Sequence, residues 1–260
     1  MPDTPIYCIN LARREDRWEK CVAQAQTNGF ELLRIDALDA QDDKAAAALD
    51  ALPLSGPVGT MSASTRACSM SHKKAWQTFV DSGADYAVFL EDDFIASARM
   101  METIEALRRL NPPLDVVKIA TLPGAKSKKI LAQKVHRIDE LGQSIYRVKS
   151  LFVGSFGYVL SRTAAARAIS RIGQSGLPVD HFLFNPARTR HTLGLPIHVV
   201  DPCVITLDTG SVSDIGMNRT TGSRTLMHAR RSFYEAGTIK GALVGLLLGK
   251  FHVIQPSFQR

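Results

Sequence analysis

The stretch Tyr86-Ala87-Val88-Phe89-Leu90-Glu91-Asp92-Asp93 joins an unbroken apolar run to three consecutive acidic residues. An apolar run of this length, preceded by Gly83 at the end of a helical pattern, is typical of a strand buried on both faces of a parallel sheet. In open α/β sheets, ligands bind beyond the carboxyl ends of such strands. The stretch therefore predicts a central strand that carries Glu91, Asp92 and Asp93 to a ligand site.

Apolar strand patterns alternate with helical patterns on both sides of this stretch. Before it, the sequence predicts strands over 6–11 and 30–35 and helices over 15–27, 42–52 and 64–82. After it, the expected elements are helices over 97–110 and 162–171, strands over 116–120, 154–160, 198–200 and 204–207, and a hairpin within 121–150. Ser161 is expected to cap the helix that follows it. This alternation predicts an α/β fold with a mostly parallel, twisted sheet and helices on both faces.

The chain is basic, with 32 Lys and Arg against 25 Asp and Glu, a net charge of +7. Such a surplus suits a polyanion, whether nucleic acid, an anionic membrane surface or a phosphorylated small molecule. The basic residues are dispersed, and the sequence lacks the combined aromatic and basic stripes that favour nucleic-acid binding. We therefore expect no nucleic-acid partner.

The cysteines and the hydropathy pattern indicate a cytoplasmic protein. None of Cys8, Cys21, Cys68 and Cys203 forms a CxxC pair, and their spacing does not suggest a zinc site. Cys8, Cys68 and Cys203 are expected to be reduced core thiols. The N-terminus lacks a basic region followed by an apolar stretch, and no segment reaches the roughly 18 apolar residues that a membrane-spanning helix needs.

The acidic triplet is the motif that carries chemistry. Carboxylates packed this closely repel one another, so folding them together costs free energy unless a cation compensates. A hard divalent cation, Mg²⁺ or Mn²⁺, bridging to a diphosphate is the natural compensator, and it would serve as the Lewis acid for a departing nucleoside diphosphate. The alternative is a solvated acidic turn without a ligand.

Several motifs, taken in order, resemble those of glycosyltransferase family 25, the lipooligosaccharide galactosyltransferase type. They are Ile9-Asn10-Leu11 with Arg13, Asp16 and Arg17; Cys68-Ser69-Met70-Ser71-His72 with Trp76; Leu90-Glu91-Asp92-Asp93; Gly157-Tyr158-Val159-Leu160-Ser161 with Ala165 and Ala166; Pro178-Val179-Asp180-His181-Phe182-Leu183; and Ser213-Asp214-Ile215. The resemblance covers about residues 5–216. The chain departs from the family where Thr65-Arg66-Ala67 precedes Cys68, because the family usually has Glu and then Gly there. Donor and acceptor preference are therefore left open.

The resemblance implies a GT-A-like fold in a single domain over 1–235, with a nucleotide-sugar-binding half over 1–120 and an acceptor half over 121–235. It also implies an inverting glycosyltransferase that moves a hexose, galactose from UDP-galactose, to a lipopolysaccharide or other cell-surface glycan acceptor. Mn²⁺ or Mg²⁺ would be the cofactor. The alternative is a non-catalytic module that binds a sugar nucleotide.

The resemblance also suggests which residues bind the UDP-sugar donor. Asn10 and Leu11 would lie near the nucleoside, and Arg13 or Arg17 would reach the diphosphate, for which a guanidinium is well suited. The alternative for the two arginines is a solvated helix start with local ion pairs. Ser71 and His72 would contact the donor from a neighbouring helix.

The resemblance also suggests roles within the acidic triplet. Asp93 is the first choice for the metal ligand and Glu91 the second, while Asp92 is also available to the donor complex. Glu91 and Asp93 alternate like a D-x-D signature, so both are expected to point to one side of an extended segment.

Inverting transfer needs a base that deprotonates the acceptor hydroxyl on the face opposite the leaving group. Asp180 is the candidate, because it follows Pro178 at a predicted loop-to-helix step. The alternative is an Asp180 that only caps the helix. His181 and Asp214 are weaker candidates.

Residues 236–260 form an apolar and basic C-terminal tail, with an apolar stretch over 239–254. This tail would either lie on an anionic membrane, as suits an enzyme acting on lipid-linked glycans, or pack on the core or a partner subunit. The first alternative would make the protein peripheral on the inner face of the cytoplasmic membrane.

Overall fold

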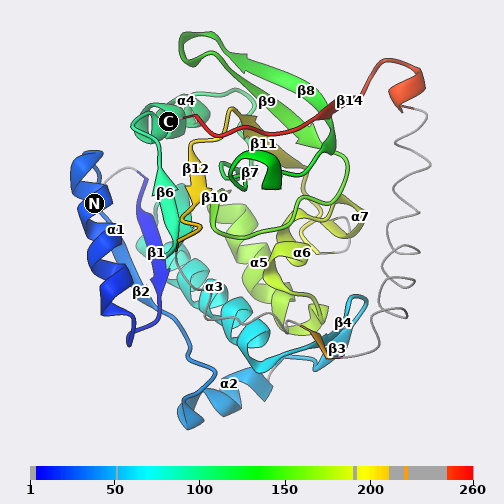
Figure 1. The fold of residues 1–260 in the computed structure, drawn as a ribbon. Coiled ribbons are helices and arrows are strands. Elements are labelled where there is room, and N and C mark those ends of the chain that lie inside the picture. Colours follow the sequence, from blue (N-terminus) through cyan, green and yellow to red (C-terminus); the bar gives the residue numbers. More distant parts are fainter. Residues whose placement is uncertain (1–3, 51, 190–191, 211–219, 222–244, 260) are drawn as a thin grey trace.

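The computed structural model describes residues 4–50, 52–189, 192–210, 220–221 and 245–259 (Figure 1). The helices are α1 (Glu15–Thr27), α2 (Ala46–Asp50), α3 (Ala63–Ser82), α4 (Met100–Arg108), α5 (Arg162–Ser175), α6 (Val179–Phe184) and α7 (Pro186–Thr189). The strands are β1 (Ile6–Asn10), β2 (Leu33–Asp36), β3 (Ser55–Gly56), β4 (Gly59–Met61), β5 (Tyr86–Glu91), β6 (Phe94–Ala96), β7 (Val116–Lys118), β8 (Ile130–Ile138), β9 (Gln143–Val148), β10 (Gly157–Ser161), β11 (Ile197–Asp201), β12 (Ile205–Leu207), β13 (Thr220–Thr221) and β14 (His252–Ile254). Residues 213–215 of the late motif and 236–244 of the tail lie outside the described residues.

A nine-stranded sheet in the order β14-β8-β9-β11-β7-β10-β5-β1-β2 forms the centre of the fold. The α/β class is confirmed. The sheet is mixed rather than mostly parallel in the described residues: β1 pairs in parallel with β2 and β5, and β7 with β11. The other neighbours in the order pair antiparallel. The reason is that the β8–β9 hairpin and the inserted β10 reverse the chain direction without a crossover helix.

Side chains of β5 alternate between the two faces of the sheet, as a strand requires. Ala87 and Phe89 belong to the core beneath α3, α5 and α6, and Val88 and Leu90 to the core beneath α1 and α4. Helices therefore cover both faces, as expected (Figure 1). Since β5 lies between β1 and β10, it is buried on both faces and both edges, which explains its unbroken apolar sequence.

The helices begin and end where their flanking residues allow. The N-cap of α3 is Ser62, whose side chain accepts a hydrogen bond from the backbone N–H of Thr65, and its C-cap is Gly83 in a left-handed conformation (φ 77°). Ser161 caps α5 as predicted, since its side chain accepts from the backbone N–H of Ala164 at 3.1 Å. These caps fix the ends of the two helices that pack against each other over β5 and β10.

Gly157, at the start of β10, allows close packing of neighbouring segments. A Cβ atom there would come within 2.8 Å of the Ala120 side chain and 2.9 Å of the Ile205 side chain. Only glycine lets β10 approach these segments so closely. This packing places Phe156 and Ser155, just before β10, at the end of the sheet where β5 finishes.

Lys118, the last residue of β7, is wholly buried beneath the loop before β10. Its Nζ donates hydrogen bonds to the carbonyl oxygens of Phe152, Val153 and Gly154 at 3.0, 2.6 and 2.6 Å. The same atom lies 4.3 Å from the centre of the Phe152 ring and 4.7 Å from that of Phe184. The ammonium group therefore fixes the loop that leads into β10.

The described part of the C-terminal tail belongs to the central sheet. Strand β14 pairs antiparallel with β8 at the sheet edge. Beyond it, the carbonyl oxygen of Pro256 accepts hydrogen bonds from the hydroxyls of Thr121 and Ser127 at 3.2 and 2.6 Å. Residues 252–259 thus pack on the core, the alternative that the sequence left open for this tail.

Replacing Ser161 with Ala should lower the free energy of unfolding by about 1–2 kcal/mol, because the variant loses the N-cap and the 2.5 Å hydrogen bond to Asp115. Ser161→Thr keeps the hydroxyl and is the matched control. Urea unfolding monitored by circular dichroism measures both. Equal stability of Ser161→Ala and the wild type would contradict the capping role.

Burial lowers the pKa of Lys118 to about 7, against the opposing charges of Asp180 and Glu91. The unfolded chain keeps this proton up to the ordinary pKa of 10.5, so between these values the unfolded state binds more protons and stability rises with pH. From pH 7 to 9, the unfolding free energy of the wild type should rise by about 2 kcal/mol relative to that of Lys118→Met. Urea unfolding of both proteins at several pH values tests this, and a constant difference would show that Lys118 stays charged in the fold.

Candidate active site

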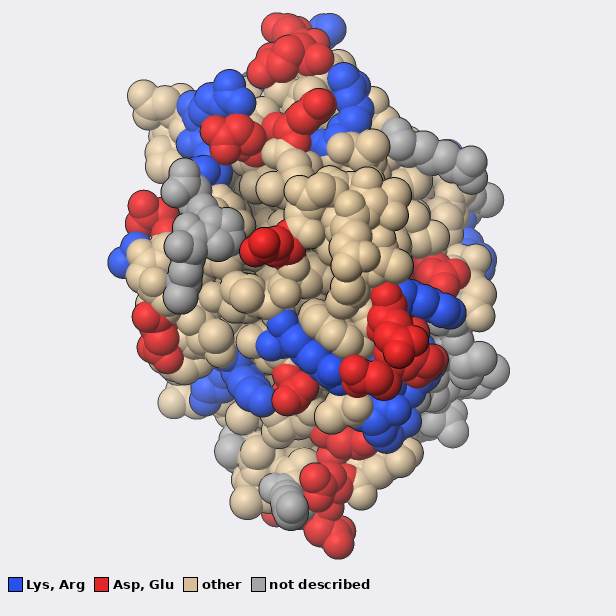
Figure 2. All heavy atoms as spheres, turned by 90° about the vertical axis from the view of Figure 1, so that its left-hand side faces the viewer, with Lys and Arg blue, Asp and Glu red and all other residues tan. Residues whose placement is uncertain are grey.

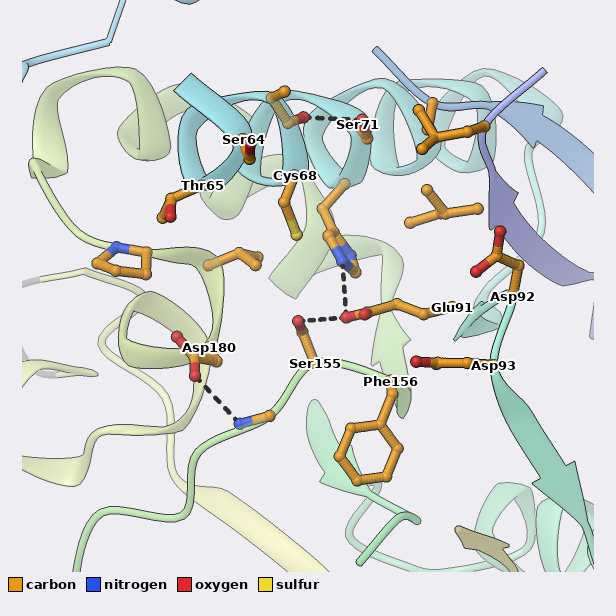
Figure 3. Close-up of a pocket in the computed structure, with 18 of the residues that line it drawn as sticks. Ser64, Thr65, Cys68, Ser71, Glu91, Asp92, Asp93, Ser155, Phe156 and Asp180 are labelled. Atoms are coloured by element: carbon orange, nitrogen blue, oxygen red, sulfur yellow. Dashed lines mark hydrogen bonds and ion pairs between the residues drawn. The ribbon is translucent and has the colours of Figure 1, made fainter. Parts of the chain in front are cut away.

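A cavity of about 650 Å³ lies at the carboxyl end of β5. The segments around it are the ends of β1 and β5, residues 37–41 after β2, the first turns of α3, the loop 153–156 and the start of α6 (Figure 3). The cavity lies where the strand-end acids predict a ligand site, since strand ends and the starts of α3 and α6 converge there.

The three acids of the triplet have different surroundings because side chains alternate along the strand. Glu91 continues the face of Ala87 and Phe89 and so points towards α3. Asp92 turns to the α1 side, where its two carboxylate oxygens accept hydrogen bonds from Arg17 Nη1 and Asn10 Nδ2, each at 2.7 Å. Asp92 is therefore already neutralised by the protein itself.

Asp93 points into the cavity beside Glu91 (Figure 3). Its Oδ1 is buried and has no hydrogen-bond partner among the residues that the structure describes. Burial, with the nearby charges of Glu91 and Asp92, raises the pKa of Asp93 to about 7, while Arg17 opposes the rise. An unpaired buried carboxylate oxygen of this kind fits a divalent cation, which would supply the missing positive charge.

His72 sits on α3 at the floor of the cavity and is wholly buried. Its Nδ1 lies 2.7 Å from Tyr158 Oη, which also accepts a hydrogen bond from Trp76 Nε1 at 2.9 Å. On the other side of the ring, Nε2 lies 3.5 Å from Glu91 Oε1. That same carboxylate oxygen accepts a 2.5 Å hydrogen bond from Ser155 Oγ.

One ligand atom from each of Cys68, His72 and Glu91 lies within 4.8 Å of the other two. Cys68 and His72 stand one helical turn apart on α3, and Glu91 faces them from β5 (Figure 3). Sequence spacing alone did not suggest this group, because the carboxylate comes from a separate strand.

Most of the other residues predicted to bind the UDP-sugar lie at the cavity. Leu11, Arg13, Arg17 and Ser71 line the cavity. Arg17 is also paired with Asp92, and Arg13 Nε contacts Asp39 Oδ2 at 2.5 Å.

Asn10 and Ser71 hold other parts of the site. Asn10 is buried and donates a hydrogen bond to Asp92. The hydroxyl of Ser71 donates to the carbonyl of Ala67 at 2.8 Å and accepts from the backbone N–H of Leu38 at 2.9 Å. It thereby fixes the segment after β2 against α3.

Asp180 lies across the cavity from the acidic triplet (Figure 3). Its Oδ2 accepts a 3.2 Å hydrogen bond from the backbone N–H of Gly154, and its Oδ1 accepts a 2.8 Å bond from that of His181. His181 lines the same cavity, and Asp214 lies outside the described residues. Asp180 lies in the cavity at the second residue of α6, whose N-cap is Pro178. It is therefore not the N-cap that the alternative assumed.

Sequence reasoning missed Ser155, Tyr158 and Lys118 as parts of the site. The quoted motif around β10 contained Tyr158, but only as a strand residue. Ser155 could have been suspected from its position, because Gly154 and Ser155 directly precede a buried strand. Polar residues at such a junction lie where a loop meets the end of a sheet. Nothing in the local pattern showed that these residues face α3 and β5.

The surface charge is mixed on the face shown in Figure 2. Lys and Arg side chains alternate there with Asp and Glu side chains, and no continuous basic stripe crosses this face. The described residues contain no helix with the length and hydropathy needed to cross a membrane.

Comparison with known proteins shows the family. The sequence model described as glycosyltransferase family 25 (LPS biosynthesis protein) matches residues 3–183. The lacto-N-neotetraose biosynthesis glycosyltransferase LgtB of Neisseria gonorrhoeae is 24% identical over 234 residues, which cover 86% of this chain and 81% of that protein.

Similar solved structures include a glycosyltransferase involved in glycosylation of the major capsid of PBCV-1 (TM-score 0.40, 9% identity, covering 89% of this chain and 99% of that one). The inositol-1-phosphate CTP transferase of T. maritima is similar to the same extent (TM-score 0.40, 8% identity, 90% and 97% covered). The family match alone spans more than half of the sequence and includes the strand-end acids, α3 and Asp180. The chain therefore belongs to glycosyltransferase family 25.

Proposed function

We propose that this glycosyltransferase moves galactose from UDP-galactose, with inversion, to a lipopolysaccharide or other cell-surface glycan acceptor. The observation that carries the proposal is the unpaired, buried Oδ1 of Asp93 in a cavity of about 650 Å³ at the end of β5. The acceptor class is supported by the description of the family, and by a relative named for the biosynthesis of a glycan, lacto-N-neotetraose.

Asp93 is the proposed ligand of Mn²⁺ or Mg²⁺, with Glu91 as the second choice. Bound there, the cation would supply charge stabilisation to the departing nucleoside diphosphate. Asp92 is a weaker candidate for this role, because each of its carboxylate oxygens already accepts a hydrogen bond, from Arg17 or from Asn10. These bonds compensate the negative charge of Asp92, whereas Asp93 Oδ1 has no hydrogen-bond partner among the described residues.

The donor nucleotide is proposed to lie between the end of β1 and residues 37–41. Leu11 offers an apolar contact there, and the backbone after β2 is fixed by Ser71. Arg13 lines the same side of the cavity and is partly exposed, so its guanidinium is placed to reach phosphate oxygens. Arg17 would act on the diphosphate from beside Asp92.

Asp180 is the proposed general base. It faces the triplet from the opposite side of the cavity (Figure 3), and inversion requires the acceptor hydroxyl to attack from the face opposite the leaving group. Its two backbone hydrogen bonds hold the carboxylate in place. The base would take the proton of the acceptor hydroxyl as the new glycosidic bond forms.

The protein is also proposed to work at the inner face of the cytoplasmic membrane. Leu247 and Leu248 are 86% and 62% exposed, and the chain carries a net charge of +7. Exposed apolar side chains on a basic protein suit binding to anionic lipid, which would bring the cavity to a lipid-linked acceptor.

A thermal-shift screen of nucleotide sugars, each with and without Mn²⁺, tests the donor and the cation together. UDP-galactose with Mn²⁺ should raise the melting temperature more than either alone, because a ligand that binds the folded state stabilises it. Asp93→Asn should abolish the Mn²⁺-dependent part of the shift and reduce transfer by about 100-fold or more. The exposed Glu102→Gln is the matched control and should behave like the wild type.

Asp93→Asn should itself be at least as stable as the wild type without the cation. Its buried amide carries no charge beside Glu91, whereas Asp93, with its pKa raised to about 7, costs stability as the pH rises through that value. A folded Asp93→Asn variant that binds the donor but transfers nothing supports catalysis. A wild type that binds a sugar nucleotide and transfers nothing would favour the binding-module alternative.

Asp180→Asn should lower kcat by about 10²–10⁴-fold and leave the affinity for the donor unchanged, because it removes the base without touching the nucleotide side of the cavity. Steady-state transfer assays and donor titrations separate the two effects. A variant that retains wild-type kcat would remove Asp180 from the mechanism and leave it as a helix-start residue.

A further inference from the structure

Hydrogen bonding in the core fixes which nitrogen of His72 carries the proton. The indole Nε1–H of Trp76 can only donate, so Tyr158 Oη accepts that bond at 2.9 Å. Among the described residues, the remaining partner of Tyr158 Oη is His72 Nδ1, at 2.7 Å. Tyr158 Oη has a second lone pair, but accepting from Nδ1 as well would leave its own buried proton without an acceptor among the described residues. Donation from Tyr158 to Nδ1 avoids this cost, and it places the N–H of the neutral imidazole on Nε2.

This Nε2–H points into the cavity without a bonded acceptor. His72 is wholly buried, and within the described part of the chain its Nε2 has no hydrogen-bond partner. Glu91 Oε1 lies 3.5 Å away, which is too far for a good hydrogen bond. Leaving a buried donor unpaired is unfavourable, so the position suits a ligand atom that accepts from His72.

The carboxylate of Glu91 limits which kind of ligand atom can accept the hydrogen bond from His72. A phosphate oxygen could accept from His72 but would stand beside the negative charge of Glu91. A cation held by Cys68, His72 and Glu91 would need the lone pair of Nε2, which the proton occupies. A hydroxyl group satisfies both residues at once, because it accepts from Nε2–H and donates to the carboxylate.

We propose that His72 and Glu91 together bind one hydroxyl group of a hexose and so determine sugar specificity, with Tyr158 and Trp76 as positioning residues that set the His72 tautomer. The inference rests on the proposed function in that the ligand is a sugar. Ser155 completes the arrangement, since its 2.5 Å hydrogen bond fixes Glu91 Oε1 opposite His72. The hydroxyl belongs either to the transferred hexose or to the acceptor sugar.

The tautomer is tested without any substrate. Nitrogen-15 NMR of histidine-labelled protein should show a protonated Nε2 and an unprotonated Nδ1 for His72. Tyr158→Phe keeps the ring that stacks 5.2 Å from Phe89 but removes the hydroxyl, and should lose this fixed tautomer. A wild-type His72 protonated on Nδ1 would overturn the proposal.

The hydroxyl is tested with UDP-galactose and its four monodeoxygalactose analogues, in the presence of Mn²⁺. The wild type should bind one analogue roughly tenfold to a hundredfold more weakly than UDP-galactose. His72→Asn keeps an acceptor for the Tyr158 hydroxyl, but its side chain does not reach the position of Nε2. Its affinities for UDP-galactose and for that analogue should differ less than twofold. His72→Gln can place an amide N–H near that position and should recover part of the discrimination.

Deoxygenated acceptors distinguish the second source of the hydroxyl. If discrimination appears only among acceptor analogues, in KM, and His72→Asn abolishes it, the bound hydroxyl is that of the acceptor and the proposal stands. If His72→Asn discriminates among all donor and acceptor analogues as the wild type does, the proposal fails. The specificity proposal is judged by ratios of affinity or KM between sugars. The proposed transfer fails in a different way, because the wild type would then make no product.

Titration with Co²⁺ tests whether a metal ion, rather than a hydroxyl group, binds between Cys68, His72 and Glu91. The expected result is no thiolate-to-cobalt absorption band from Cys68. A band in the wild type that Cys68→Ser and His72→Asn both remove would show a metal on the Nε2 lone pair and overturn the proposal, whatever the transfer activity.

Discussion

The arrangement of the site depends on how the fold accommodates three carboxylates at the end of one buried strand. Alternation along β5 sends Asp92 to the α1 face, where Arg17 and Asn10 bind it, and Glu91 to the α3 face, where Ser155 binds it. Asp93 is left in the cavity with a buried oxygen that no described residue pairs. The protein thus neutralises one acid, orients the second and leaves the third for a ligand.

The other side of the cavity depends on a buried lysine. Lys118 binds three successive carbonyl groups from beneath, and the same loop presents the Gly154 N–H to Asp180 and the Ser155 hydroxyl to Glu91. Because one loop contacts both Glu91 and Asp180, the acidic strand end and the proposed base keep a fixed relation across the cavity. A buried ammonium that donates to three carbonyls is an effective way to hold a loop without regular structure.

The aromatic core under α3 connects the strand of the acidic triplet to His72 at the cavity floor. Tyr158 stacks with Phe89 and with His72, at centroid distances of 5.2 and 5.7 Å, and also bonds Trp76. The strand of the acidic triplet and the helix of the Ser-His motif are therefore joined through one tyrosine of β10. Three motifs that are separate in the sequence, those of α3, β5 and β10, are therefore packed together in this member of glycosyltransferase family 25.

The sequence by itself determined the α/β class, the bounds of α1, the Ser161 cap and the placing of an acidic triplet at a buried strand end, because periodicity, capping residues and apolar runs reflect local burial. Only the tertiary structure decided which acid is compensated, that Asn10 is hydrogen-bonded to Asp92, and that Ser155, Tyr158 and Lys118 contribute to the packing and hydrogen bonds of the site. It also decided the mixed strand directions of the sheet. The physical reason is distance along the chain: the Glu91–Ser155 and His72–Tyr158 contacts join residues 64 and 86 positions apart, and no local pattern specifies which side chains such pairings bring together.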